Sequence, residues 1–177
     1  MFSGRKEFQM PKSRLIAKLR QECPFCGEEH EVELRERTGS MMIRGALVRY
    51  PERYFLCTQG GGSEEEYEFE TSTLLNENYI RAAAAYRESR GLLGAEEIQA
   101  IRERYAMKTS DLAALLGCSR ELVIGYETMY VQDLAQDRLM KELRDHPASL
   151  MERLARIRES FSAESYRTIQ AAALQQA

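Results

Sequence analysis

Residues 95–128 read AEEIQAIRERYAMKTSDLAALLGCSRELVIGYET, and this stretch decides the fold of the second half of the chain. Its apolar residues recur at helical spacing in three short groups, which predicts three short helices. The expected inward faces are Ile98, Ile101 and Tyr105, then Leu112, Ala113 and Leu116, then Leu122, Val123 and Tyr126. Gly117 ends the second helix, and Ser119 is a suitable N-cap for the third. A small residue at 113 and a glycine between two helices suit the close crossing of a helix-turn-helix.

The segment beyond residue 130 extends the helical pattern to the end of the chain. Residues 131–146 would complete a five-helix bundle and give a helix-turn-helix domain over 95–146, with Leu134, Leu139, Met140 and Leu143 in its core. Residues 147–177 form further helices, in which Leu150, Leu154 and Ile157 repeat at helical spacing. Such a stripe is typical of a core or of a dimer seam. We interpret it as a set of dimer contacts and expect a homodimer.

The segment before residue 72 has a different pattern. Val32 and Leu34 alternate with charged residues, and Tyr67 and Phe69 do the same, which indicates strands. We therefore expect a small β domain over 21–72 and a connecting helix over 73–94 that stops at Gly91. The predicted fold class is α+β: a zinc-ribbon-like β domain followed by an all-helical domain with extra C-terminal helices.

Charge is unevenly distributed along the 177 residues, whose formal net charge is −3. Residues 1–20 carry +5 and are interpreted as a basic arm, whereas residues 21–70 carry −7. Such asymmetry favours different partners for different segments, although the preferred interpretation of the basic start is a solvated arm. No run reaches the roughly 20 apolar residues of a membrane span, and the first ten residues hold no secretory apolar run. We expect a cytoplasmic protein without a membrane partner.

One motif has clear chemistry, Cys23-Pro24-Phe25-Cys26-Gly27. Two cysteines spaced by two residues can direct both thiolates at one zinc ion, but a tetrahedral site needs four ligands. Cys57 offers a third ligand; its partner three positions later would be Gly60, so the second pair is half missing. His30 is the candidate fourth ligand, unless the strand that leaves the knuckle carries it away. Two interpretations stay open: a bound zinc ion, or a metal-free remnant of a zinc ribbon.

The other cysteine and the remaining motifs offer no further chemistry. Cys118 lies in the helical segment, where we expect it to be packed. The sequence contains no phosphate loop, GxSxG or HExxH motif, and its two histidines fall in different domains. We therefore expect the protein not to be an enzyme.

A CPxCG knuckle, a small sheet, a connecting helix and the pattern RxxYxMxxxDLAxLLG…YE together resemble the MqsA-type antitoxins, which are zinc-finger/helix-turn-helix regulators with an Xre-like DNA-binding domain. The resemblance runs from about Cys23 to Pro147. It implies that the N-terminal domain binds and neutralises a toxin. It also implies that the C-terminal domain dimerises and binds operator DNA, so that the protein represses its own operon. The alternative is a protein-interaction module that keeps the helix-turn-helix only for dimerisation.

The resemblance also assigns the DNA-contacting positions, with some departures. The two base-reading positions of the family hold Glu121 and Gly125, and its helix cap and phosphate-contacting glutamine match Lys108 and Thr109. A glutamate can accept a hydrogen bond from cytosine but repels phosphate, and a glycine reads nothing. The expected DNA contacts are therefore Lys108 and Thr109 to the backbone and Ser119, Arg120, Glu121 and Ile124 toward the bases.

Overall fold

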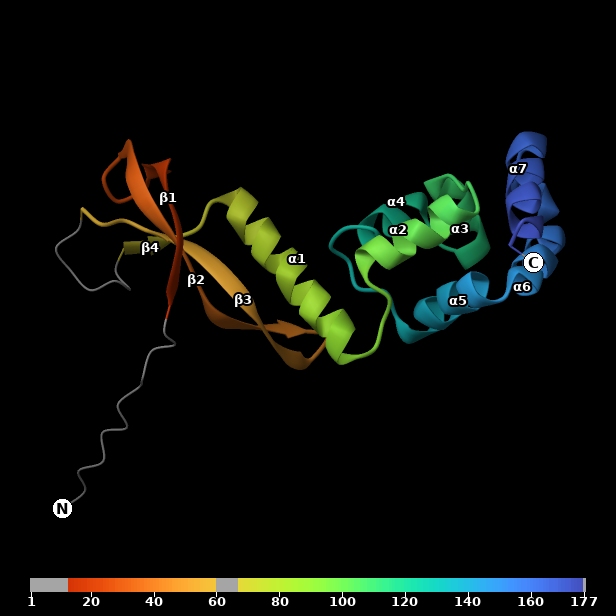
Figure 1. The fold of residues 1–177 in the computed structure, drawn as a ribbon, viewed down its shortest axis with the longest axis horizontal. Coiled ribbons are helices and arrows are strands. Elements are labelled where there is room, and N and C mark those ends of the chain that lie inside the picture. The colour runs from red at the N-terminus through yellow and green to blue at the C-terminus, as the bar shows by residue number, and fades with distance from the viewer. Residues whose placement is uncertain (1–12, 60–66, 177) are drawn as a thin grey trace, which may run out of the picture. The chain divides into compact units, whose positions relative to one another are not determined.

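The computed structural model describes residues 13–59 and 67–176 and confirms the α+β class: an antiparallel sheet comes first and helices follow (Figure 1). The elements are β1 (Arg14–Cys23), β2 (Glu28–Ile43), β3 (Ala46–Leu56), β4 (Glu68–Phe69), α1 (Ser72–Ser89), α2 (Ala95–Arg104), α3 (Thr109–Leu116), α4 (Arg120–Tyr126), α5 (Leu134–Asp145), α6 (Pro147–Arg156) and α7 (Ala163–Leu174). The chain divides into two compact units, Met1–Ala82 and Ala83–Ala177, and the boundary falls within α1. None of the helices in the described part is both long and apolar enough to cross a bilayer.

The sheet has the order β1-β2-β3-β4, and each strand is antiparallel to the next. The β2–β3 hairpin turns at Arg44 and Gly45, whose φ angles are 48° and 76°. Two successive positive φ angles give the type I′ turn that matches the right-handed twist of paired strands.

The basic arm expected over 1–20 is wrong for its second half, because residues 14–20 belong to β1. They pair with β2 from Arg14 opposite Glu36 to Arg20 opposite Glu31, so cations of one strand meet acids of the next. Opposite charges across a strand pair stabilise it, and this pairing explains why a charged segment becomes a strand. Residues 1–12 of the expected arm lie outside the described residues.

The first unit has a small apolar core in which Val32, Phe55 and Leu74 are buried. The first turns of α1 are also held by Asn78, which is 1% exposed. Its Oδ1 accepts from the Arg53 backbone N–H at 2.9 Å, and its Nδ2 donates to the Arg53 carbonyl at 2.7 Å. Asn78 thus ties α1 to β3, and its side chain satisfies two backbone groups of that strand.

The second unit has one core, and all the helices from α2 to α7 contribute to it. The residues expected on the inward faces of the first three helices are buried there, except Leu122, which is partly buried. The prediction that Leu134 lies in the core is wrong, because this residue begins α5 with 61% of its surface exposed. The interpretation of Leu150 and Leu154 as dimer contacts is also wrong. Both are 0% exposed within the single chain, so they are core residues and cannot form a dimer seam.

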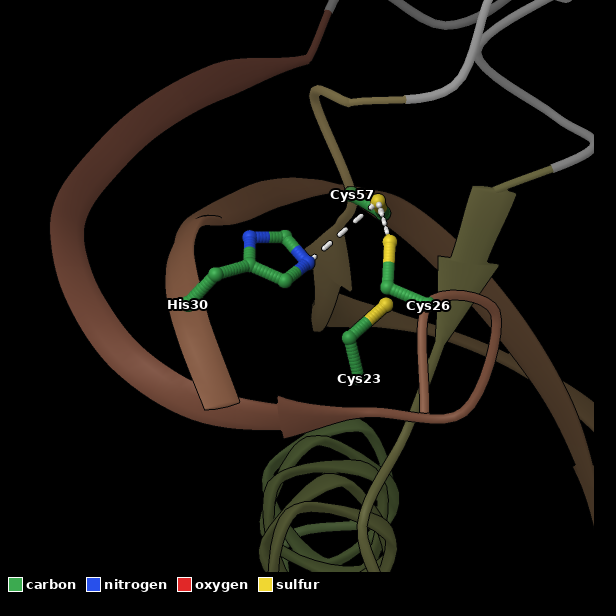
Figure 2. A group of neighbouring side chains, drawn as sticks. All are labelled: Cys23, Cys26, His30 and Cys57. Atoms are coloured by element: carbon green, nitrogen blue, oxygen red, sulfur yellow. Dashed lines mark hydrogen bonds between the residues drawn. The ribbon is translucent and has the colours of Figure 1, made fainter. Parts of the chain in front are cut away.

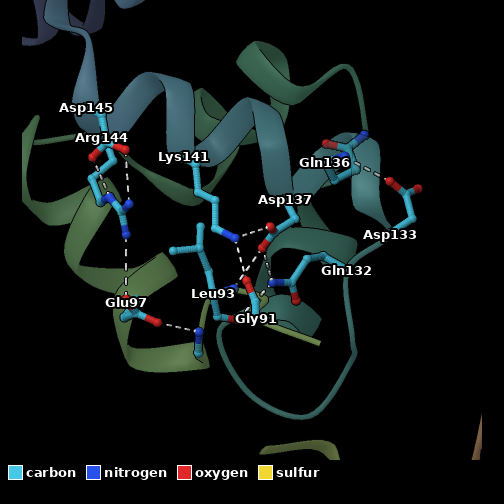
Figure 3. Close-up of polar contacts among 11 residues, drawn as sticks. Gly91, Leu93, Glu97, Gln132, Asp133, Gln136, Asp137, Lys141, Arg144 and Asp145 are labelled. Carbon is cyan, nitrogen blue, oxygen red and sulfur yellow. Dashed lines mark hydrogen bonds and ion pairs between the residues drawn. The ribbon is translucent and has the colours of Figure 1, made fainter. Parts of the chain in front are cut away.

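A buried carboxylate joins α5 to the segment that precedes α2 (Figure 3). Asp137 Oδ1 accepts from the Leu93 backbone N–H at 2.8 Å and from the Gln132 side-chain amide at 2.9 Å. Lys141 places its ammonium 2.7 Å from Oδ2 of the same carboxylate. Burial alone would raise the pKa of Asp137, but these donors outweigh it and the pKa is lowered.

The lowered pKa predicts how this unit responds to acid. A carboxyl with a depressed folded-state pKa contributes stability above its unfolded pKa of about 3.9, and loses it as the pH falls through the folded value. Asp137→Asn should therefore cost about 1–3 kcal/mol at neutral pH, and the cost should shrink in strong acid. Urea unfolding at several pH values measures this difference, with Glu142→Gln, an exposed change on the same helix, as the control. An equal cost at every pH would show that the carboxylate charge is not what matters.

Candidate metal centre and candidate nucleic-acid interface

Four side chains from three separate places in the chain converge beside the sheet (Figure 2). Cys23 is the last residue of β1, Cys26 lies in the turn that follows, His30 is near the start of β2, and Cys57 directly follows β3. The turn closes through the Gly27 N–H, which donates to the Cys23 carbonyl at 2.8 Å, and Gly27 has a φ of 72°. Glycine is suited to this left-handed position, which lets the chain reverse directly behind the two thiols.

The ligand atoms of Cys23, Cys26, His30 and Cys57 all lie within 4.8 Å of one another. The Cys26 and Cys57 sulfurs are 3.5 Å apart, and the Cys57 sulfur is 3.6 Å from His30 Nε2. Three of the four residues are buried and Cys26 is exposed. This group can hold a metal ion, and three thiolates with one imidazole form a common structural zinc set.

The imidazole is oriented for ligation by its other nitrogen. His30 Nδ1 lies 2.7 Å from the Glu31 backbone carbonyl. A carbonyl can only accept, so Nδ1 carries a proton, and in the neutral imidazole the Nε2 lone pair faces the sulfurs. Metal-bound histidines are usually fixed in this way by a second partner on the outer nitrogen. The strand therefore does not carry His30 away from the knuckle, and the histidine stands in for the missing cysteine of the second pair. Gly60, where that cysteine would be, lies outside the described residues.

The thiols affect one another strongly. A hydrogen bond with Cys57, together with desolvation and the proximity of Cys23, raises the pKa of Cys26 to about 12. The hydrogen bond with Cys23 is also the main reason why the pKa of His30 is raised. Without a cation, crowded sulfurs keep their protons because adjacent thiolates would repel one another. A divalent ion reverses this preference, because it binds the thiolates and displaces their protons.

Cys118 is separate from this cluster. It is partly buried against the core of the helical unit, and burial raises the pKa of its thiol. Cys118 therefore packs against the core, as predicted from the sequence.

In the helical unit, α3 and α4 form the two helices of the expected helix-turn-helix. Gly117 follows α3 in the left-handed conformation, with φ 69°, and Ser119 caps α4 by accepting from the Leu122 N–H at 3.2 Å. At the start of α3, the Lys108 N–H donates to Asp111 Oδ2 at 2.8 Å. Lys108 thus occupies the N-cap position while Asp111 supplies the capping oxygen.

Four of the six expected DNA contacts lie at the N-terminal ends of these two helices: Lys108, Thr109, Ser119 and Arg120. The ends are adjacent, since Arg120 Nε donates to Thr109 Oγ1 at 3.2 Å. Glu121 is exposed in the first turn of α4, and Ile124 is 39% exposed one turn later. The structure therefore places all six on the accessible surface of α3 and α4, with Thr109 half-buried.

Two arginines that the sequence did not single out fix the far end of α4. Arg87, 3% exposed, donates to the Tyr126 carbonyl at 2.8 Å. Arg102 forms a two-pronged ion pair with Glu127 at 2.5 and 3.0 Å. Both contacts join residues at least 25 positions apart, which periodicity along the chain cannot reveal.

Comparison with protein-family models, curated proteins and solved structures found no match for this chain. The part of the antitoxin resemblance that the structure bears out is the order of its modules: a sheet with a Cys₃His group, then a helical unit.

The cluster predicts about one zinc ion per purified chain, with affinity that falls as the pH falls because protons compete for the thiolates. Chelation should loosen the sheet unit and spare the helices, as circular dichroism and thermal melting would show. His30→Ala and Cys57→Ser should each lower zinc affinity by more than the roughly 10- to 100-fold typical of outer-shell changes, while Cys118→Ser serves as the control. An identical melting temperature with and without zinc would show that the cysteines are packing residues and that the group is not a zinc site.

Proposed function

We propose that this protein is a sequence-specific DNA-binding regulator of the antitoxin type, in which α4 enters the major groove. The observation that supports the proposal is the contact between Arg120 and Thr109, because it brings the N-terminal ends of α3 and α4 to one accessible face. In helix-turn-helix proteins the N-terminal residues of the second helix contact base edges, while the helix before it crosses the backbone.

The residues on this face divide by chemistry. Lys108 and Thr109, at the start of α3, supply a cation and a hydroxyl for phosphates, which fix position without reading sequence. Arg120 is the candidate base reader, since a guanidinium can donate to O6 and N7 of guanine together. Its contact with Thr109 is exposed, so the guanidinium can be released toward a base at small cost.

The acidic residues near this face limit affinity. Glu127 is neutralised by Arg102, but Glu121 is exposed in the first turn of α4. A free carboxylate at the groove disfavours phosphate and favours a cytosine amino group, so it makes binding weaker but more selective.

We also propose that zinc occupies the Cys₃His group and that the sheet unit is the protein-binding half. The strand pairing weakens the acidic surface expected for a basic toxin, because residues 13–70 together hold eight basic and twelve acidic side chains, a net −4. Many of them are paired with one another, as Arg14 with Glu36 and Arg37 with Glu52 and Glu68 show. Toxin capture therefore rests on the resemblance and on the presence of a separate, metal-binding unit.

A homodimer remains part of the proposal. Two symmetric copies would place their α4 helices about 34–36 Å apart, or a multiple of that distance, and would require a palindromic operator. Because Leu150 and Leu154 are internal, the dimer contact must use other side chains of the helical unit, such as the exposed Leu174.

The test is a footprint on the region upstream of the protein's own gene at two salt concentrations. Arg120→Ala should weaken specific binding by about 1–3 kcal/mol and relax one operator position, whereas Lys108→Ala should weaken all sequences alike and flatten the salt slope. Glu121→Gln should raise non-specific binding. Arg167→Ala, which removes an exposed arginine from α7, is the charge-matched control.

Two outcomes would contradict the proposal. One is the absence of any protected palindrome at low salt, and the other is an Arg120→Ala footprint identical to that of the unaltered protein. Either would favour the alternative, a protein-interaction module whose helix-turn-helix serves only for dimerisation.

A further inference from the structure

Gly125 lies on α4 one turn after Glu121, at the edge of the helix's exposed face. The position is buried although glycine has no side chain, because the ring of Tyr130 covers it. A Cβ added to Gly125 would lie 2.1 Å from Tyr130 Cδ2 and 2.8 Å from Cγ and Cε2. The tyrosine ring therefore fills the space into which a side chain at residue 125 would project.

The segment that carries Tyr130 is firmly held on the helix. The Tyr130 N–H donates to the Gly125 carbonyl at 2.7 Å, and Thr128 Oγ1 donates to the same carbonyl at 3.1 Å. From the inner side, the buried Arg87 guanidinium donates to the carbonyls of both Tyr126 and Tyr130. The backbone from 125 to 130 is thus fixed at both ends, and the ring is positioned in advance of any binding event.

The ring is only partly used for packing. Half of the Tyr130 surface is exposed, at 50%, and Ile124 on the adjacent part of α4 is 39% exposed. If Tyr130 served only to fill the space at Gly125, complete burial of its ring would give the largest hydrophobic stabilisation. This half-exposed tyrosine covers the position one turn after Glu121, and its hydroxyl is an uncharged hydrogen-bond donor, which a phosphate does not repel as it repels the carboxylate.

We propose that Tyr130 is a DNA-contacting residue of the α4 face and replaces the side chain that Gly125 lacks. Its ring lies against the sugar and base-edge wall of the groove, and its hydroxyl donates to a phosphate oxygen, a common role of tyrosine in protein–DNA contacts. The inference rests on the proposed DNA-binding function and adds one residue, contributed by the loop after α4, to the contacts of the helix itself.

The absence of tryptophan from the sequence allows a direct test. Tyr130→Trp introduces a single emission probe on the α4 face, and Tyr166→Trp introduces the matched probe on α7. Adding a duplex of the gene's upstream region should quench the emission at 130 and shield it from iodide, while the emission at 166 should stay unchanged. Thermal melting and the footprint establish that each variant folds and binds the duplex.

Tyr130→Phe provides a second measurement that does not depend on the larger indole. It keeps the ring on Gly125 and removes only the hydroxyl, so the melting temperature should stay the same while affinity for the duplex falls about three- to tenfold. If the unaltered protein binds the duplex but the emission at 130 does not change and Tyr130→Phe binds equally well, Tyr130 is a packing residue and the inference is wrong. If the unaltered protein binds no duplex at all, the proposed function fails and this inference fails with it.

Discussion

The sheet unit depends on one constraint, the meeting of three sulfurs and an imidazole within 4.8 Å. The group joins the end of β1, the start of β2 and the residue after β3, so a metal ion held there would tie three strand ends together. Small domains with few buried side chains commonly obtain this stability from a metal. The Glu31 carbonyl turns the fourth ligand toward the sulfurs, which means that the backbone of β2 has already specified the geometry a cation requires.

The same unit shows why net charge along a sequence is a poor guide to charged surfaces. The first 20 residues and the next 50 carry opposite net charges, which favours two separate binding surfaces. Antiparallel pairing of β1 with β2 instead places Arg14, Lys18 and Arg20 beside glutamates of β2. Each exposed pair contributes little to stability, but together they reduce the net negative charge of this unit from the −7 of residues 21–70 to −4 over residues 13–70.

Secondary-structure elements that depend on the local sequence pattern could be predicted, whereas contacts between residues far apart in the chain could not. The helices α2 to α4, the Gly117 stop and the Ser119 cap follow from spacing and capping within about four residues. The cysteines could be named, but whether His30 joins them depends on the register of β2 against β1. A leucine stripe such as Leu150 and Leu154 has the same spacing in a core as in a dimer seam, so only the fold distinguishes the two.

In the helical unit, the position of α4 is fixed by polar contacts with the residues at and after its C-terminal end. Arg87 donates to the Tyr126 carbonyl at the end of α4, and Arg102 pairs with the side chain of Glu127 directly after it. Asp137 ties α5 to the backbone before α2. A seven-residue helix is too short to be stable alone, so its orientation is set by these contacts. The conformational entropy of α4 is already lost during folding, so little more is lost on binding. On the proposed function, this short helix, whose one arginine and one glutamate cancel in charge, recognises a duplex through few contacts that are already in position.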